Sequence, residues 1–376
     1  MREWQEYKNF REFWSLVFGF PKHDILLVNS RHGQWLPVAF EGFGAFHYDP
    51  RIRPSVWCFR FWFTRIFLTK SVPRNVRSLV AIARTVGASR IVASDAFRDL
   101  MDVESSLPET KLFWTQHGLY LDQSGSTLQR EDTNGFRDSR IVLFALSEYD
   151  QNNYRRWGAS KLNTIPVGSL NNGIHEKTRA QVSSICRSDF DICLIEKGLK
   201  LNPDSDYGRG FKENWDNFLP IFSEYINSER PRLIVAVSKS SERSAVVRYL
   251  YDKLKYDFTI TDEDDFSTYR ASDLANVTIG IASTVLAESL SRKRKVLSFN
   301  CTTYTVWDFP GSNFVRINSE PQLPLELLRT KLNETLALSW EDYAKKASET
   351  LQLFAVDGSK TIDRIRHEVT DGLAIQ

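Results

Sequence analysis

Cysteine is scarce in this sequence, and the cysteines present form no pattern. Cys58, Cys186, Cys193 and Cys301 are the only ones among 376 residues. None belongs to a Cys-x-x-Cys pair or has a histidine at ligand spacing, which disulfide frameworks and zinc sites require. We therefore predict free thiols in a reducing compartment and no zinc site.

Long uncharged hydrophobic runs are also absent. The most apolar stretch, residues 56–68, is interrupted by Arg60 and Arg65. It is shorter than the about 20 apolar residues that span a bilayer. Residues 1–8 carry charges where an export signal needs an apolar stretch. We expect a cytoplasmic protein, and peripheral contact with the inner face of the cytoplasmic membrane stays open.

Neither sign of charge dominates the chain. It has 49 basic and 47 acidic residues, for a net charge of +2. A nucleic-acid-binding protein would show a strongly basic face or stripe, so no nucleic-acid partner is expected. The acidic residues 262–265 raise the alternative of a metal site, but no supporting ligand accompanies them. We expect a surface loop there and no bound metal.

The rest of the composition is that of a globular protein. Apolar residues make up 42% of the chain and charged residues 26%. A length of 376 residues suits about two domains of ordinary size. Aromatic residues reach 13%, including 10 Trp. We expect them first in the cores, while stacking on sugars or bases and an interfacial belt stay open.

Short apolar runs alternate with helical stretches along the chain. The first half carries predicted strands at residues 24–29, 90–95, 111–118, 140–147 and 162–169, and helices at 76–86 and 148–157. The second half carries predicted strands at 189–195, 232–237, 258–261, 277–281 and 295–299, and helices at 211–228, 242–254 and 283–291. Continuous apolar strands between helices predict parallel sheets covered on both faces, which is an α/β fold.

A polar stretch divides the two series. We place the linker at residues 170–174, which gives an N-terminal domain at 1–170 and a C-terminal domain at 171–376. The last helical region, residues 323–353, could pack back across the gap onto the first domain. In open α/β sheets, ligands bind beyond the carboxyl ends of the strands. The strand tips are therefore the places to look for a site.

One strand tip carries a pattern typical of anion binding. Residues 277–281 run straight into a helix that begins at Ser283 and Thr284. The free N–H groups and the positive dipole end of such a helix attract anions, and the two hydroxyls add donors. Glu288 lies on the same helix face as Thr284, where it could accept hydrogen bonds from ribose hydroxyls. Alternatively, Ser283 only caps the helix and Glu288 is solvated.

Residues 273–300 resemble the C-terminal-domain signature of GT-B glycosyltransferases that build bacterial surface carbohydrates. The shared pattern is a strand, a Ser-Thr helix start at Ser283, Glu288, a basic turn at residues 292–295 and a strand that ends in Phe-Asn300. The pattern is similar to a surface-carbohydrate biosynthesis transferase family. It is related more distantly to the Kdo transferases of capsule and lipopolysaccharide synthesis and to CDP-glycerol glycerophosphotransferases.

Two segments of the first half resemble the same enzymes. Trp114-Thr-Gln-His117-Gly118 resembles their His-Gly strand tip, and residues 147–169 resemble the segment that leads into their hinge. The resemblance runs in order from residue 90 to residue 300. It implies a GT-B-like fold, with two Rossmann-like domains facing each other across a cleft. It also implies a nucleotide-sugar donor as substrate, with no cofactor and no metal.

The first domain offers three candidate catalytic residues at its strand tips. His117 suits a general base on an acceptor hydroxyl, because a neutral imidazole titrates near neutral pH. Asp122 could orient that imidazole or contact the donor sugar, and Asp95 supplies a third carboxylate. Each has a structural alternative: His117 could hold a loop, Asp122 could cap a turn, and Asp95 could cap a helix.

Further donor-binding candidates follow other strands. Lys239 and Ser238 come directly after residues 232–237 and could meet the donor phosphate, although a solvated loop is an equal alternative. Gly118 lets a ligand approach the backbone. Ser169 could bring a backbone amide to the hinge near the phosphates, or it could be part of a plain linker turn. Residues 196–198, Glu-Lys-Gly, could read the nucleotide, but we interpret them as an ordinary turn.

Aromatic and basic residues are interleaved at residues 57–68. Such a mixture suits a membrane interface or a lipid-linked acceptor. The aromatic positions surround the expected helix rather than forming one stripe, which favours a buried helix with Arg60 and Arg65 extending to solvent.

The working hypothesis is transfer of a glycosyl group from a nucleotide-activated donor to a growing surface glycan or lipid-linked glycan. The resemblance to Kdo transferases implies a CMP-sugar such as CMP-Kdo as a candidate donor, and UDP-sugars are not excluded. Glycerophosphate transfer and sugar-nucleotide 2-epimerisation are alternatives on the same fold. A non-catalytic scaffold of a polysaccharide assembly complex is a third.

Overall fold

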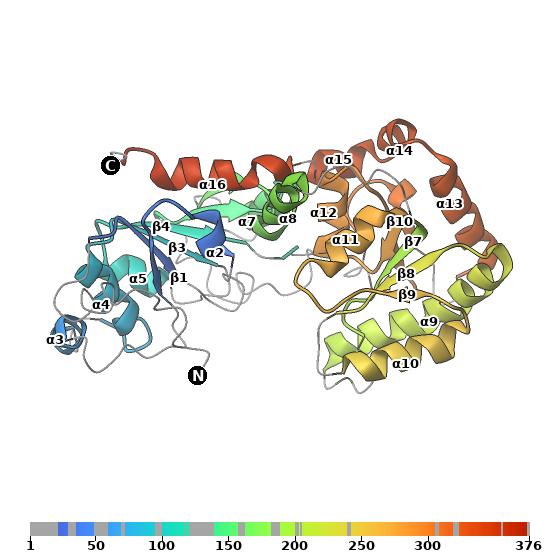
Figure 1. Ribbon diagram of the computed structural model, residues 1–376, viewed down its shortest axis with the longest axis horizontal. Coiled ribbons are helices and arrows are strands. Elements are labelled where there is room, and N and C mark those ends of the chain that lie inside the picture. The colour runs from blue at the N-terminus through green and yellow to red at the C-terminus, as the bar shows by residue number, and fades with distance from the viewer. Residues whose placement is uncertain are drawn as a thin grey trace.

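Twelve described strands form two separate sheets, one in each half of the chain (Figure 1). The computed structural model describes residues 22–28, 35–48, 59–68, 72–94, 100–116, 118–119, 139–156, 162–181, 189–199, 203, 205–238, 242–304, 308–318, 323–354 and 356–373. Within each sheet, every neighbouring pair of strands is parallel. The prediction of an α/β fold with parallel sheets is confirmed.

The first sheet has the order β2-β1-β3-β4-β5-β6. Its strands are β1 (Ile25–Val28), β2 (Phe46–Tyr48), β3 (Arg90–Ser94), β4 (Lys111–Thr115), β5 (Val142–Ala145) and β6 (Asn163–Pro166). The sequence predicted all of these except β2, which has three residues and too little apolar pattern to be recognised. We call this sheet and the helices that cover it the first lobe.

The second sheet has the order β12-β11-β10-β7-β8-β9. Its strands are β7 (Phe190–Ile195), β8 (Leu233–Ala236), β9 (Thr259–Ile260), β10 (Ala275–Gly280), β11 (Lys295–Asn300) and β12 (Arg316–Asn318). The three-residue edge strand β12 is the one that the sequence pattern missed. This sheet and its covering helices form the second lobe.

Helices cover both faces of the first sheet. One face packs against α3 (Phe59–Phe67), α4 (Arg77–Val86), α5 (Leu100–Ser106) and α7 (Glu148–Arg156). The other face packs against α2 (Leu36–Ala39), α8 (Leu170–Gln181) and α16 (Thr361–Thr370). Helix α4 ends at Gly87, whose φ of 73° lies in the left-handed region, as its sequence position predicted.

Helices also cover both faces of the second sheet. On one side lie α9 (Asp206–Glu229), α10 (Arg243–Leu254) and α13 (Leu325–Ala337). On the other side lie α11 (Ser267–Leu274), α12 (Thr284–Ser291), α14 (Trp340–Lys346) and α15 (Ser348–Phe354). Aromatic side chains fill much of the interior, and Trp215, Phe218 and Phe299 are all fully buried. The expectation that aromatic residues go first to the cores is borne out for these.

The segment that we interpreted as a linker is helical. Residues 170–174 form the start of α8, and Leu170 and Ile174 are buried against the first sheet. The polar composition was misleading because only one face of α8 is apolar, and these two side chains lie one helical turn apart on it. Helix α8 therefore belongs to the packing of the first lobe.

The C-terminal helix α16 also returns to the first lobe. Figure 1 shows α16 lying along the first sheet, far along the chain from the strands it covers. Ile362, Ile365 and Val369 are buried in the same core cluster as α8. Thr361 donates a hydrogen bond from Oγ1 to the carbonyl of Val167 at 2.8 Å. The chain thus crosses between the lobes twice.

The expectation of a fully buried helix at residues 57–68 is wrong for the described part, α3. Phe61 and Leu68 are buried, but Phe63, Ile66 and Phe67 are 65%, 62% and 70% exposed. Only one side of α3 reaches α4, because the helix lies at the outer end of the first lobe (Figure 1).

Three smaller expectations concern cysteines, acidic residues and membrane spans. Cys193 and Cys301 are free and buried. Residues 262–265 are exposed, and Glu263 pairs with Arg243 at 3.1 Å, as a surface loop would allow. Across the described ranges, no helix combines the length and the apolar character needed to cross a bilayer.

Candidate functional site

The order of the second sheet creates a switch point at its centre. From β7 the chain proceeds through β8 to β9 on one side, and then returns to place β10 on the other side of β7. In such sheets the connections leave the two central strand tips in opposite directions, which opens a crevice between them. The tips of β7 and β10 are therefore where a ligand of this lobe is expected.

The tip of β10 leads directly into helix α12. Ser283 has the extended backbone of an N-cap, and its Oγ accepts a hydrogen bond from the backbone N–H of Leu286. The amides of the first turn have no carbonyl partner within a helix, and they carry the positive end of its dipole. Thr284 is the first residue of α12 and is half-buried. The predicted helix start is confirmed.

The start of α12 faces the first lobe. The backbone N–H of Leu119 donates to Oγ1 of Thr284 at 2.8 Å, although 165 residues separate them. A Cβ placed on Gly118 would lie 3.6 Å from the same oxygen. The segment after β4 therefore contacts the helix start, which places the start of α12 at the interface between the lobes.

Gln116 holds this segment in place. Its Nε2 donates to the carbonyl of Gly118 and to Oδ1 of Asp150, both at 2.7 Å. Its Oε1 accepts from the backbone N–H of Leu146 at 3.2 Å. The side chain is buried, so these bonds are protected from solvent. Sequence reasoning passed over Gln116 because nothing in the sequence shows that β4 and β5 are neighbours.

Glu288 lies one turn below the helix start and is only 5% exposed. Burial raises the pKa of its carboxyl group, while hydrogen bonds from Ser169 and Tyr269 and the charge of Arg292 oppose that rise. Its Oε2 has no hydrogen-bond partner among the described residues. The alternative of a solvated Glu288 is therefore wrong. A buried carboxylate oxygen without a donor retains an unused capacity to accept a hydrogen bond.

Lys197, at the tip of β7, brings a cation to the same place. It is half-buried, and burial lowers the pKa of its ammonium group, while the nearby Glu288 carboxylate opposes that shift. We had interpreted residues 196–198 as an ordinary turn. The order of the sheet is what makes Lys197 a candidate site residue, because β7 and β10 are neighbours only in the folded chain.

Glu196, beside it, has a different role. Its Oε2 accepts from both the backbone N–H and Oγ of Ser238, at 3.0 and 2.7 Å, and its Oε1 accepts from the N–H of Leu199 at 2.9 Å. The carboxylate therefore ties the tips of β7 and β8 together. The hydroxyl proton of Ser238 is used in this contact, so a role of Ser238 at a donor phosphate stays a prediction that requires it to rearrange.

A buried charge network locks the lobes together beside the site. Asp273 lies 2.9 Å from Nε2 of His175 and 3.0 Å from Nε of Arg292. Arg179 and Arg294 approach the same carboxylate at 3.2 and 3.4 Å. Burial alone would raise the pKa of Asp273, but the His175 hydrogen bond and the arginine charges hold it well below its usual value. His175 and Arg179 belong to α8, which packs on the first lobe.

Four candidate residues lie outside the described residues. They are His117, Asp122, Asp95 and Lys239. Their proposed roles stay predictions, as does the expected absence of a metal. Among the described ranges, no group of three or more His, Cys, Asp or Glu side chains has the geometry to hold a metal ion.

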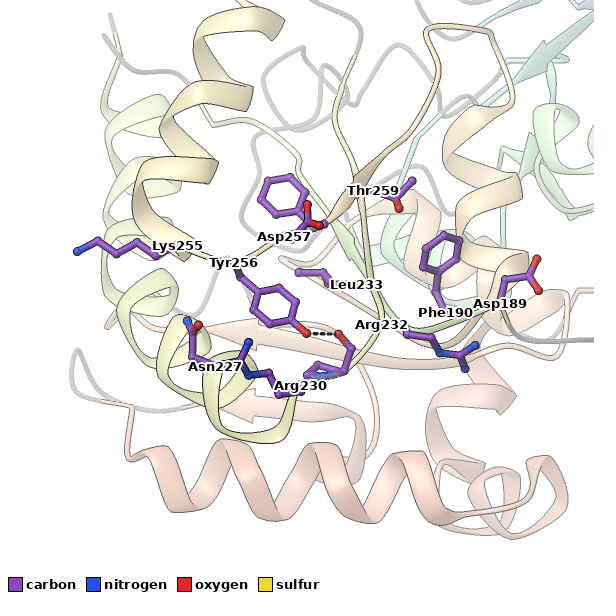
Figure 2. A pocket seen from close by; sticks show the side chains of 12 residues that line it. Asp189, Phe190, Asn227, Arg230, Arg232, Leu233, Lys255, Tyr256, Asp257 and Thr259 are labelled. Carbon is purple, nitrogen blue, oxygen red and sulfur yellow. Dashed lines mark hydrogen bonds between the residues drawn. The ribbon is translucent and has the colours of Figure 1, made fainter.

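A cavity of about 480 Å³ lies elsewhere in the second lobe (Figure 2). Phe190, Leu233 and Thr259, at the starts of β7, β8 and β9, line it. It therefore lies at the edge of the sheet opposite the tips of β7 and β10. The Tyr256 hydroxyl in Figure 2 donates to the carbonyl of Pro231 at 2.8 Å, which joins two loops. This cavity lies between the ends of α9 and α10 and the starts of the strands, away from the candidate site.

Comparison with solved structures identifies the fold. A putative UDP-N-acetylglucosamine 2-epimerase from Listeria monocytogenes matches with a TM-score of 0.57 and 10% identity, over 93% of this chain and 96% of that one. A UDP-GlcNAc 2-epimerase from Neisseria meningitidis, bound to UDP-GlcNAc, matches with 0.55 and 12%, over 92% and 99%. A glycosyltransferase from Rickettsia africae matches with 0.49 and 12%, over 94% and 100%.

At these identities the likeness shows the fold. The chain has the GT-B-like architecture of two Rossmann-like domains, as its sequence predicted. No protein-family model matches the sequence, and no curated protein does.

Proposed function

We propose that the chain binds a nucleotide-activated sugar between its lobes and transfers the glycosyl group to a hydroxyl of a growing surface glycan. The observation that carries this proposal is the buried start of α12, which meets the first lobe through Thr284 and Leu119. Preorganised amides and Lys197 would receive the charge that develops on the departing nucleotide phosphate. Such an arrangement needs no divalent cation for that role.

Glu288 would select the nucleoside part of the donor. Its unpartnered Oε2 can accept a hydrogen bond from a ribose hydroxyl, and the bonds from Ser169 and Tyr269 already fix its orientation. Binding of a ribose therefore relieves a buried acceptor that the folded protein leaves without a donor. Ser169 then acts through its hydroxyl at Glu288, rather than only through its backbone amide.

His117 is the proposed general base for the acceptor hydroxyl. Its proposed place in the reaction follows from its sequence position between Gln116 and Gly118. The α12 start offers hydrogen-bond donors to any nucleotide phosphate, so UDP-sugars and CMP-sugars are both candidate donors. Acceptor and linkage are left to experiment.

A screen of donors tests this proposal. The chain would be incubated with UDP-sugars, CMP-sugars and CDP-glycerol, with and without acceptor glycans, and nucleotide release would be measured. We expect one sugar nucleotide to be consumed only in the presence of an acceptor. His117→Ala should abolish release and leave nucleotide affinity intact, whereas His367→Ala, at an exposed position on α16, should change neither. Tight binding without turnover of any donor would favour a scaffold instead.

Sugar-nucleotide 2-epimerisation is the second candidate. The two structures with TM-scores of 0.57 and 0.55 are named as UDP-GlcNAc 2-epimerases and overlap this chain nearly end to end. An epimerase needs no acceptor, and it exchanges the proton at the sugar carbon that it inverts. Incubation of UDP-GlcNAc in deuterated buffer without acceptor separates the two. Deuterium at C2 of the sugar supports epimerisation, and its absence, with acceptor-dependent release, supports transfer.

A further inference from the structure

Helix α3 presents an apolar face that nothing described covers. Ile66 and Phe67 lie three and four residues after Phe63, which places all three on one side of the helix. They are 65%, 62% and 70% exposed, and the rings of Phe63 and Phe67 lie 4.5 Å apart. Phe61 and Leu68 are buried in the core on the other side. Three adjacent large apolar side chains at this exposure mark a binding surface.

The stretch of sequence that contains this face carries charge of one sign. Residues 50–94 contain nine basic residues and no aspartate or glutamate, in a chain whose net charge is only +2. The nine are Arg51, Arg53, Arg60, Arg65, Lys70, Arg74, Arg77, Arg84 and Arg90. Asp102 of α5, which lies outside the segment, accepts a hydrogen bond from Asn75 at 2.9 Å.

Arg65 and Arg74 are two of these arginines that reach solvent. Arg65 lies over the ring of Trp62 at 5.2 Å and donates to Oγ of Ser78 at 3.2 Å, so its stem packs on the helix while its charge stays half-exposed. Arg74 is exposed in the turn between α3 and α4. An anionic membrane surface has two layers, the boundary of the acyl chains and the lipid phosphates. Apolar side chains suit the first layer, and cations suit the second.

We propose that α3 docks on an anionic phospholipid membrane, with Phe63, Ile66 and Phe67 entering the interface and the surrounding arginines meeting the lipid phosphates. The helix has nine residues, so the contact is a reversible one that holds the first lobe against the membrane plane. This surface lies outside the interlobe site, and its test does not depend on the proposed reaction.

Vesicle flotation of the full chain tests the proposal. Vesicles of phosphatidylcholine alone would be compared with vesicles of equal parts phosphatidylcholine and phosphatidylglycerol. We expect binding to the anionic vesicles only, and a loss of binding as salt is raised. Phe63→Ser and Phe67→Ser should each lower the partition coefficient about tenfold, because each removes one apolar side chain from the interface.

Matched controls separate this surface from the rest of the molecule. Tyr251→Ser removes an exposed aromatic side chain from α10 in the second lobe, and it should leave vesicle binding unchanged. Arg74→Glu should weaken binding to anionic vesicles about tenfold, whereas Arg248→Glu, on the exposed side of α10, should not. Thermal unfolding of each variant checks that the fold is intact, as expected for surface positions.

Three outcomes would overturn the proposal. The first is equal binding of wild type and the Phe63→Ser, Phe67→Ser double variant to anionic vesicles. The second is self-association of the wild type that the same double variant abolishes, with no vesicle binding, which would assign the face to a second copy of the chain. The third is binding of a nucleic acid but not of vesicles, with loss in Arg74→Glu.

Discussion

The backbone N–H of Leu119 donates to Oγ1 of Thr284 across the boundary between the two lobes, at 2.8 Å. Leu119 follows a strand tip of the first sheet, and Thr284 begins the helix that follows a strand tip of the second. This hydrogen bond joins the first lobe to the helix start that we propose as the phosphate site. A change at Thr284 should therefore affect both the contact between the lobes and the affinity for a ligand.

Thr284→Val removes this hydrogen bond while keeping the shape of the side chain. The N–H of Leu119 loses its acceptor, and a ligand phosphate loses a hydroxyl donor. We expect nucleotide affinity to fall about tenfold in titration calorimetry. Thr284→Ser keeps the hydroxyl and should bind within about threefold of wild type. Equal affinity in the valine variant would remove Thr284 from the site.

Glu288→Gln tests the proposed ribose contact through pH. Burial raises the pKa of the Glu288 carboxyl group, so acidification protonates it earlier than an exposed glutamate. The carboxylate is a better acceptor for a ribose hydroxyl than the protonated carboxyl group is. Wild-type affinity for a nucleotide sugar should therefore fall as pH decreases through that raised pKa. The Gln variant should bind about tenfold more weakly at neutral pH and should lack this pH dependence.

The matched control for this prediction is Glu349→Gln, at an exposed position on α15. It should reproduce the wild-type affinity and pH profile. A Glu288→Gln variant whose affinity still falls on acidification would mean that another group titrates, and that Glu288 does not receive the ribose.

Asp273→Asn should weaken the fold in a pH-dependent way. The pKa of Asp273 is held below its usual value, so its ionised form contributes stability above the unfolded pKa of about 3.9, and this is lost as pH falls toward the folded value. Near pH 7 the variant should lose about 3–5 kcal/mol of unfolding free energy, because buried arginines lose their partner. Urea unfolding of both proteins from neutral to acidic pH should show the gap narrowing below about pH 4. A constant gap would contradict the assignment.

Gly168→Ala should destabilise the crossing between the lobes. Gly168 has a φ of 98°, and a Cβ there would lie 2.4 Å from Oγ1 of Thr361 at the start of α16. Both the backbone strain and the clash act against alanine, so we expect a loss of about 3 kcal/mol or more. Gly87→Ala shares a left-handed φ of 73° but meets no atom within 4 Å, so it should lose only about 1–2 kcal/mol. Chemical denaturation gives both values, and equal losses would mean that the Thr361 contact is loose.

The sequence predicted the parts of the fold that local pattern controls. Buried parallel strands appear as continuous apolar runs, and the Ser283-Thr284 helix start follows from capping chemistry. The sequence analysis did not predict helix α16, although Ile362, Ile365 and Val369 share one face. The local sequence does not predict that α16 packs on the first sheet, because this packing depends on where the chain leaves the second lobe.

The site required information that only sheet order supplies. Lys197 looked like a turn residue, and it becomes a site residue because β10 lies beside β7 in the folded protein. The same holds for Gln116 and Tyr269, each of which acts on a residue far along the chain. Helix α3 shows the opposite limit. Its aromatic surplus indicated a buried helix, but Phe63, Ile66 and Phe67 are exposed and Phe61 is buried.

Nucleotide titration of two lysine variants tests the central claim most directly. Lys197 lies beside Glu288, at the carboxyl ends of the strands of the second sheet. Lys255 lies at the amino ends of the strands, where it lines the cavity shown in Figure 2. Calorimetry with UDP, CDP and CMP should show tight binding of at least one nucleotide to wild type, about tenfold weaker binding to Lys197→Met, and unchanged binding to Lys255→Met. Binding that depends on Lys255 and not on Lys197 would contradict the account, as would no binding of any of the three.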